Sequence, residues 1–224
     1  MPPAILGPYT RTILTAAIIA AALGFSFTYA RLSVYTELMP FFEWMETTWF
    51  GYVGKTWGAA FATIQAGHLI GLAVLGGCVI VSDGRLLGVL LTDVPHRKVI
   101  DRADRVFFWA LITLLATGVF MACGVAMKIY YLPVYWYKML ALGAGILFHY
   151  YVRRPLVAHE IESINPIILK MTAIASILVW FLVAATGRWI CLLYTSPSPR
   201  DQRGSGVAAC GWKKKRGGGG GGGG

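Results

Sequence analysis

The chain has 224 residues, of which 57% are hydrophobic and 13% are charged, and this balance excludes an ordinary soluble globular protein. A mean hydropathy of +0.62 instead indicates a multi-pass membrane protein, with the lipid bilayer as its first partner. The formal net charge of +10 by itself suggests an anionic partner such as a nucleic acid, but much of this charge lies in the last 34 residues.

The C-terminal segment 191–224 differs from the rest of the chain in composition. Its first part, Cys191 to Asp201, resembles one reading frame of a DNA adaptor used in sequencing libraries, and a lysine run followed by glycines resembles translated homopolymers. We therefore expect an artefactual segment that takes no part in the fold. The alternative is a disordered basic tail that binds RNA or anionic lipid. Without this segment the net charge falls to +5, and no nucleic-acid partner is expected.

Five apolar segments are long enough, at about 1.5 Å per residue, to cross a hydrocarbon layer about 30 Å thick. They predict an all-α integral membrane bundle of about five transmembrane helices. The segments are Ile13–Ala30, Trp57–Ile80, Val106–Met127, Tyr135–Val152 and Ile167–Thr186. The alternative for the first segment is a signal peptide, but its length and the poor cleavage site after it favour a retained helix.

The connections between these segments predict how the bundle is oriented. An aromatic stretch with Glu37, Glu43 and Glu46 precedes the second segment and is typical of a membrane–water interface. The next connection is strongly basic, and Asp93 followed by Pro95 predicts the start of a short cytoplasmic helix there. With the N-terminus inside, nine basic residues lie on the cytoplasmic side and five outside, which predicts an N-in, C-out protein of the bacterial inner membrane.

The chain is expected to comprise three parts. Residues 1–40 form an N-terminal transmembrane helix and linker, residues 41–190 form a four-helix membrane domain, and residues 191–224 form the tail. The tail holds two of the four cysteines. The other two, Cys78 and Cys123, lie inside apolar segments, so neither a disulfide framework nor a cysteine-based metal site is expected.

Two histidines, His68 and His149, lie inside predicted spans. A polar side chain at this depth is costly and commonly marks a functional site. His68 follows Trp57 by 11 residues and His149 follows Trp136 by 13, which predicts imidazoles about 16 and 20 Å below one aromatic belt. The two rings are therefore expected to face each other at similar depth.

A glycine lies one helical turn from each histidine on the same face, Gly71 after His68 and Gly145 before His149. Such small residues let a flat macrocycle or a neighbouring backbone approach closely. The arrangement suits a haem b whose iron is bound by both imidazoles, with Gln65 orienting a ligand. Two other interpretations remain open: histidines that are structural or handle protons, and metal transport, for which a carboxylate or thiolate at matching spacing is missing.

Three further residues are weaker candidates for a site. Asp83 and Arg85 come where the second segment reaches the cytoplasm, and they are expected to pair with each other or with a lipid head group, or simply to anchor the helix. Lys138, near the outer face, suits a carboxylate or a haem propionate, and snorkelling to the interface explains it equally well.

Several short strings carry a resemblance to a known family when taken in order. They are Phe41-Phe42-Glu43-Trp44, His68-Leu69-Ile70-Gly71, Asp83-Gly84-Arg85-Leu86-Leu87-Gly88, Trp136-Tyr137-Lys138-Met139 and Gly187-Arg188-Trp189. Together they resemble uncharacterised small bacterial inner-membrane proteins, which are distantly similar to copper-resistance protein D-like and haem-associated membrane proteins. The resemblance covers Phe41 to Trp189 and implies no catalytic residue.

Two functions of different classes follow as hypotheses. The first is a bis-histidine haem b protein that transfers electrons to a redox partner. The second is a non-redox membrane component, either a small transporter or a subunit of a larger complex. No phosphate-binding loop, zinc-protease motif or nucleophile elbow is present in the sequence, so no enzyme class is assigned.

Overall fold

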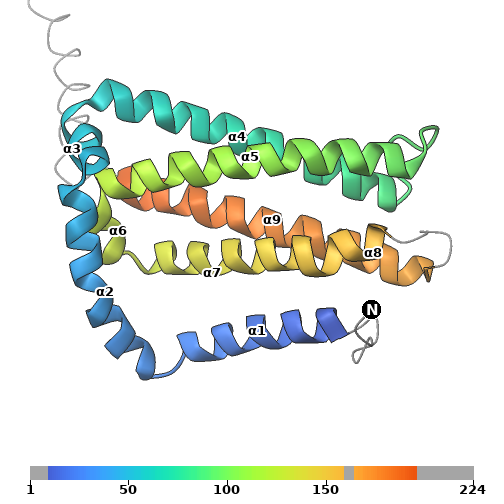
Figure 1. Cartoon of the computed structure of the whole chain (residues 1–224), viewed down its shortest axis with the longest axis horizontal. Helices are drawn as coiled ribbons and strands as arrows, with labels where there is room; N and C mark the ends of the chain where they lie inside the picture. The colour runs from blue at the N-terminus through green and yellow to red at the C-terminus, as the bar shows by residue number, and fades with distance from the viewer. Residues whose placement is uncertain (1–9, 159–163, 196–224) are drawn as a thin grey trace, which may run out of the picture. The chain divides into compact units, whose positions relative to one another are not determined.

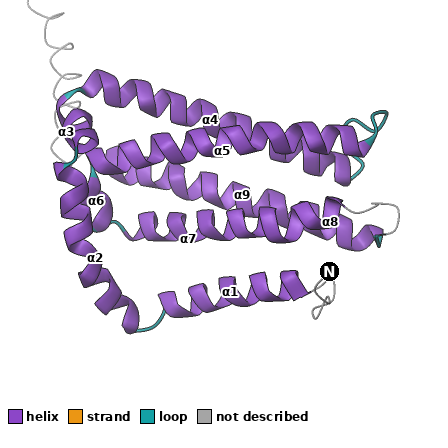
Figure 2. Ribbon diagram, in the orientation of Figure 1, coloured by secondary structure: helices purple, strands orange, loops and turns teal. Residues whose placement is uncertain are grey.

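The computed structural model describes residues 10–158 and 164–195, and all regular structure in these ranges is helical (Figure 2). The all-α fold class is therefore confirmed for these ranges. Residues up to Gly187 form one compact unit, and the arrangement given below is that of this unit. The adaptor-like tail lies outside the described residues from 196 onward, so its interpretation stays a prediction.

Three helices are long enough and apolar enough to cross a membrane. They are α4 (Gly58–Leu86), α5 (His96–Gly124) and α9 (Pro166–Thr195), the last by its part Pro166–Ile190. The chain is thus consistent with a membrane protein. A fourth span is counted when α1 (Thr10–Ser26) and α2 (Ala30–Thr47) are taken as one, although the two helices are bent by 87°.

The expected fourth span is divided among three helical segments that follow one another directly. These are α7 (Pro133–Leu147), a π-helix η1 (Phe148–Arg153) and α8 (Arg154–Ala158). The α-helical part α7 has 15 residues and is too short to span by itself. The count of five spans is therefore not confirmed, and neither is the orientation.

The basic connection before α5 differs from the prediction. Pro95 is the N-cap of α5, and the helix continues without a break from His96 to Gly124. The expected short cytoplasmic helix and the third span are therefore one helix of 29 residues. Pro95 fits this position because it lacks an N–H that a helix start would leave unpaired.

Three short or transverse helices gather at one end of the bundle, where α2 runs across the end rather than along it (Figure 1). The other two are α3 (Trp49–Thr56) and α6 (Ala126–Tyr130). Tyr35 of α2 stacks on Tyr130 with ring centroids 4.2 Å apart, and each phenol donates a hydrogen bond to the other residue's carbonyl oxygen, at 2.8 and 2.7 Å. These paired rings and hydrogen bonds hold α2 against α6.

The centre of the bundle is apolar and lies between α4, α5, α7 and α9 (Figure 1). Its buried members are Leu75, Val79, Phe107, Ala110, Leu111, Ala141, Trp180 and Val183. This cluster separates the end that carries α2, α3 and α6 from the opposite end, where α4 turns into α5. That opposite end holds most of the buried charge.

Candidate functional site

A buried ionic cluster joins α4, α5 and η1 at the end opposite α2. The guanidinium of Arg153 donates three hydrogen bonds: Nε to Oδ1 of Asp83 at 2.7 Å, Nη1 to Oδ1 of Asp104 at 3.1 Å, and Nη2 to Oγ of Ser82 at 2.7 Å. Arg153 is 1% exposed and Asp83 is fully buried. Buried charges persist only when they are paired and hydrogen-bonded, so the three segments are held in one geometry by this contact.

The π-helix η1 places His149 in the same cluster. Its imidazole is 3% exposed and stacks on Phe107, with ring centroids 3.9 Å apart and 15° between the planes. Nε2 lies 4.0 Å from Oδ1 of Asp104, and Nδ1 has no hydrogen-bond partner among the described residues. One turn of π-helix within an α-helical run is uncommon and is frequent at functional sites.

The fully buried Ser176 brings α9 to the same cluster. Its hydroxyl has no hydrogen-bond partner among the described residues, which leaves a buried polar group near the ionic cluster. Four helical segments of the bundle thus contribute polar side chains to one buried site.

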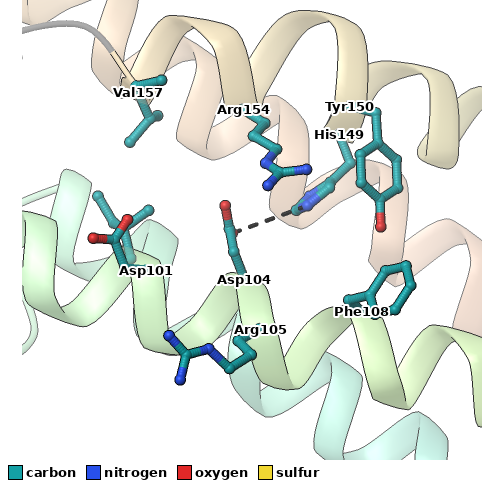
Figure 3. Close-up of a pocket in the computed structure, with 10 residues that line it drawn as sticks. Asp101, Asp104, Arg105, Phe108, His149, Tyr150, Arg154 and Val157 are labelled. Atoms are coloured by element: carbon teal, nitrogen blue, oxygen red, sulfur yellow. Dashed lines mark ion pairs between the residues drawn. The ribbon is translucent and has the colours of Figure 1, made fainter.

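A cavity of about 620 Å³ adjoins the cluster between α5 and the η1–α8 segment. His149 and Arg154 reach toward Asp104 across it, as Figure 3 shows. The polar and charged residues that line it are Asp101, Asp104, Arg105, His149, Tyr150 and Arg154. The side chain of Asp104 is 19% exposed, so the cavity connects the buried cluster with the surroundings through this carboxylate.

His68 occupies a different place in the bundle. Its Nδ1 lies 2.8 Å from Oγ1 of Thr117 on α5, and the ring packs over Gly118. His149 of η1 stacks on Phe107, which lies on the same helix, α5, as Thr117. Thr117 and Phe107 are ten positions apart, which is about 15 Å along a helix axis.

The two imidazoles are therefore not brought together, contrary to the sequence prediction of similar depth. Metal–imidazole bonds of about 2 Å require ring nitrogens about 4 Å apart on opposite sides of one iron. In this arrangement a haem bound by both His68 and His149 does not fit. The contacts with Thr117 and Phe107 place the two imidazoles at different levels along α5, so counting residues from Trp57 and Trp136 did not give their relative depth.

The two candidate glycines pack helices together instead of lining a macrocycle site. A Cβ on Gly71 would lie 3.4 Å from Leu114 of α5, and a Cβ on Gly145 would lie 3.2 Å from Val179 of α9. They therefore allow close approach of α4 to α5 and of α7 to α9. Gln65, the proposed orienting residue, is half-buried on α4.

The three weaker candidates have separate roles. Asp83 pairs with Arg153 and not with Arg85. Arg85 instead donates hydrogen bonds to the carbonyl oxygens of Val94 at 2.9 Å and Thr92 at 3.2 Å, which closes the loop between α4 and α5. The amine of Lys138 lies next to Gly187 of α9.

Two residues at the centre of the site were not identified from the sequence. Arg153 directly follows the fourth predicted segment, Tyr135–Val152, and Asp104 lies among the basic residues before the third. One signal could have revealed Arg153, because it stands four residues after an intramembrane histidine and therefore near it on a helix. No sequence signal points to its pairing with Asp83, which is 70 positions away.

Residues 41–193 match a family of unknown function (DUF6644). The matched range contains every residue of the ionic cluster and of the cavity beside it, whereas α1 precedes it. The expected resemblance to proteins without an assigned function is thereby confirmed, and the distant similarity to copper-resistance and haem-associated proteins gains no support. No curated protein and no solved structure gives a significant match.

Proposed function

We propose that this chain, which belongs to that family of unknown function, is a multi-pass membrane protein that binds and releases a proton at the pair Asp104–His149. The observation that carries the proposal is the position of Oδ1 of Asp104, 3.1 Å from Nη1 of Arg153 and 4.0 Å from Nε2 of His149. Ionisable groups in a membrane bundle that face one another and a cavity are typical of proton-handling sites.

The charge balance of the cluster supports proton binding. Two carboxylates, Asp83 and Asp104, share one guanidinium, that of Arg153, so one negative charge lacks a buried cation. A proton bound by Asp104 or His149 neutralises this excess inside a medium of low dielectric, where uncompensated charge is costly. The cavity lined by Asp104 and His149 supplies a route for the proton.

The proposal belongs to the non-redox class of hypotheses. The buried apolar cluster around Leu75, Phe107 and Leu111 lies between the ionic cluster and His68. Among the described residues the proton-binding pair therefore communicates with one side of the bundle. This suits the binding step of a small transporter, or a sensing subunit, better than a continuous channel.

We also propose five spans, with the run α7–η1–α8 as the fourth crossing, α1 as the first, and α2 lying at the interface. The run from Pro133 to Ala158 is helical throughout and has enough length for a crossing. Basic residues gather at the end that holds the ionic cluster: Arg85, Arg97, Lys98, Arg102, Arg105, Arg153, Arg154 and Lys170. By the positive-inside rule this end faces the cytoplasm, in the inner membrane of a bacterium, with the N-terminus inside.

Infrared difference spectroscopy of the purified protein tests the proton site. The carboxyl band of Asp104 is assigned by its loss in Asp104→Asn, and its titration is followed with and without His149→Gln. Groups that share one proton titrate as a pair, so we expect the midpoint of this band to move by about one pH unit or more in His149→Gln. In Glu43→Gln, which changes an exposed carboxylate on α2, the Asp104 band should not move. An unmoved midpoint in His149→Gln would refute the proposal.

A further inference from the structure

A second cavity, of about 470 Å³, lies between α4 and α5 on another face of α5. Its walls are mainly small apolar side chains, among them Val74 and Val81 from α4 and Val99 and Val106 from α5. The residues of α5 that line it are different from those that line the cavity beside Asp104. It is therefore a separate site, independent of the proton-binding pair.

The cavity is elongated along the helices. On each helix its lining extends over eight positions, from Val74 to Val81 and from Val99 to Val106, which is about 10 Å of helix. Gly77 lies in the middle of the α4 wall, and no atom lies within 4 Å of the position its Cβ would take. An apolar groove of this direction accommodates a stretch of hydrocarbon chain lying along the bundle.

Two basic side chains, those of Lys98 and Arg102, also line this apolar cavity. Lys98 and Arg102 are four residues apart on α5, so their side chains project on one face of the helix. Both are exposed, and neither forms an ion pair with any residue in the described ranges. An ammonium and a guanidinium at this spacing can bind one phosphate from two directions.

We propose that this groove, lined by α4 and α5 with Lys98 and Arg102 at its edge, is a binding site for one anionic phospholipid. The phosphate is held by the two cations and one acyl chain lies against the valines. The site matches both the phosphate and the acyl chain of such a lipid. Free phosphate would leave the apolar groove empty, and a zwitterionic lipid has no net negative charge to match the two cations. Basic sites between membrane helices at the interface are known to bind anionic head groups in this way.

Native mass spectrometry of the delipidated full chain in detergent tests the proposal, with phosphatidylglycerol and phosphatidylcholine as probes. One phosphatidylglycerol should be retained per chain, and the double variant Lys98→Gln/Arg102→Gln should bind it about tenfold to thirtyfold more weakly. Gly77→Leu keeps both charges but fills the groove, and it should weaken binding to a similar extent. The control Arg31→Gln/Arg97→Gln removes the same charge from exposed positions that do not line the groove and should bind as the wild type.

Three results would overturn the proposal. The first is equal retention of phosphatidylcholine, and the second is competition by inorganic phosphate, which would indicate a site for the free anion. The third is binding of phosphatidylglycerol by Lys98→Gln/Arg102→Gln as tight as that of the wild type. Both substituted positions are exposed, so this variant is expected to fold even if Gly77→Leu does not. None of these results depends on the proton-binding pair.

Discussion

Replacing Arg153 with methionine tests whether the buried ionic cluster holds the helices together. The change removes the guanidinium that bonds to Asp83, Asp104 and Ser82 and leaves Asp83 buried without a cation. Loss of one partner from a buried ion pair costs about 3–5 kcal/mol of folding free energy. For a chain of this size, that corresponds to a fall of about 6–20 °C in the thermal unfolding midpoint.

The assay is thermal unfolding in detergent, followed by tryptophan fluorescence. Arg154→Met is the matched control, because the adjacent Arg154 is exposed and an exposed charge contributes at most about 1 kcal/mol. The double variant Asp83→Asn/Arg153→Met should recover part of the loss, since it no longer buries an unpaired carboxylate. If Arg153→Met unfolds within about 3 °C of Arg154→Met, the cluster does not stabilise the bundle and the reasoning is wrong.

Two further predictions concern the end of the bundle that carries α2 and α3. Gly54→Ala should lower the unfolding midpoint, at a cost of about 1–3 kcal/mol, because its Cβ would lie 2.9 Å from the backbone Cα of Gly124. The control Gly58→Ala has open space around its Cβ and should leave the midpoint unchanged. Equal effects of the two substitutions would contradict the close approach of Gly54 to Gly124. Burial raises the pKa of Glu46, but the hydrogen bonds from Lys55 and from a backbone N–H outweigh burial and leave the pKa below its usual value. Glu46 therefore stabilises the fold at neutral pH and loses this contribution as pH falls through the lowered pKa. The difference in unfolding free energy between wild type and Glu46→Gln should therefore shrink in acid. A difference that stays constant with pH would refute this role of Glu46.

Much of the helical architecture could be predicted from the sequence. The segments around His68 and Ala116, and the one from Ile167, are apolar runs that must form helices to satisfy their backbone groups in lipid, and α4, α5 and α9 correspond to them. The limits of the helical run that begins at Pro133 could not be found in this way. The helical run continues through the buried Arg153 to Ala158, whereas apolar length alone ends it at Val152.

The candidate site was only partly predictable. The sequence selects His149 because a polar group inside a span is costly, and Asp83 as a weaker candidate where the second segment reaches the cytoplasm; both lie in the cluster. The pairing of His149 with His68 was wrong, because a residue count along each helix determines neither the level at which a side chain meets α5 nor the face on which it lies. His68 meets Thr117 and His149 meets Phe107 because helix rotation and packing, set by many contacts, decide those faces.

The sequence by itself determined that the chain is helical and suited to a membrane, since hydrocarbon demands long apolar segments whose backbone hydrogen bonds are all made internally. Only the tertiary structure decided that Arg153 bonds to Asp83 and Asp104 while His68 and His149 stay apart. The physical reason is that burial of charge depends on meeting a partner from a distant part of the chain, and such a meeting is fixed by how the helices pack.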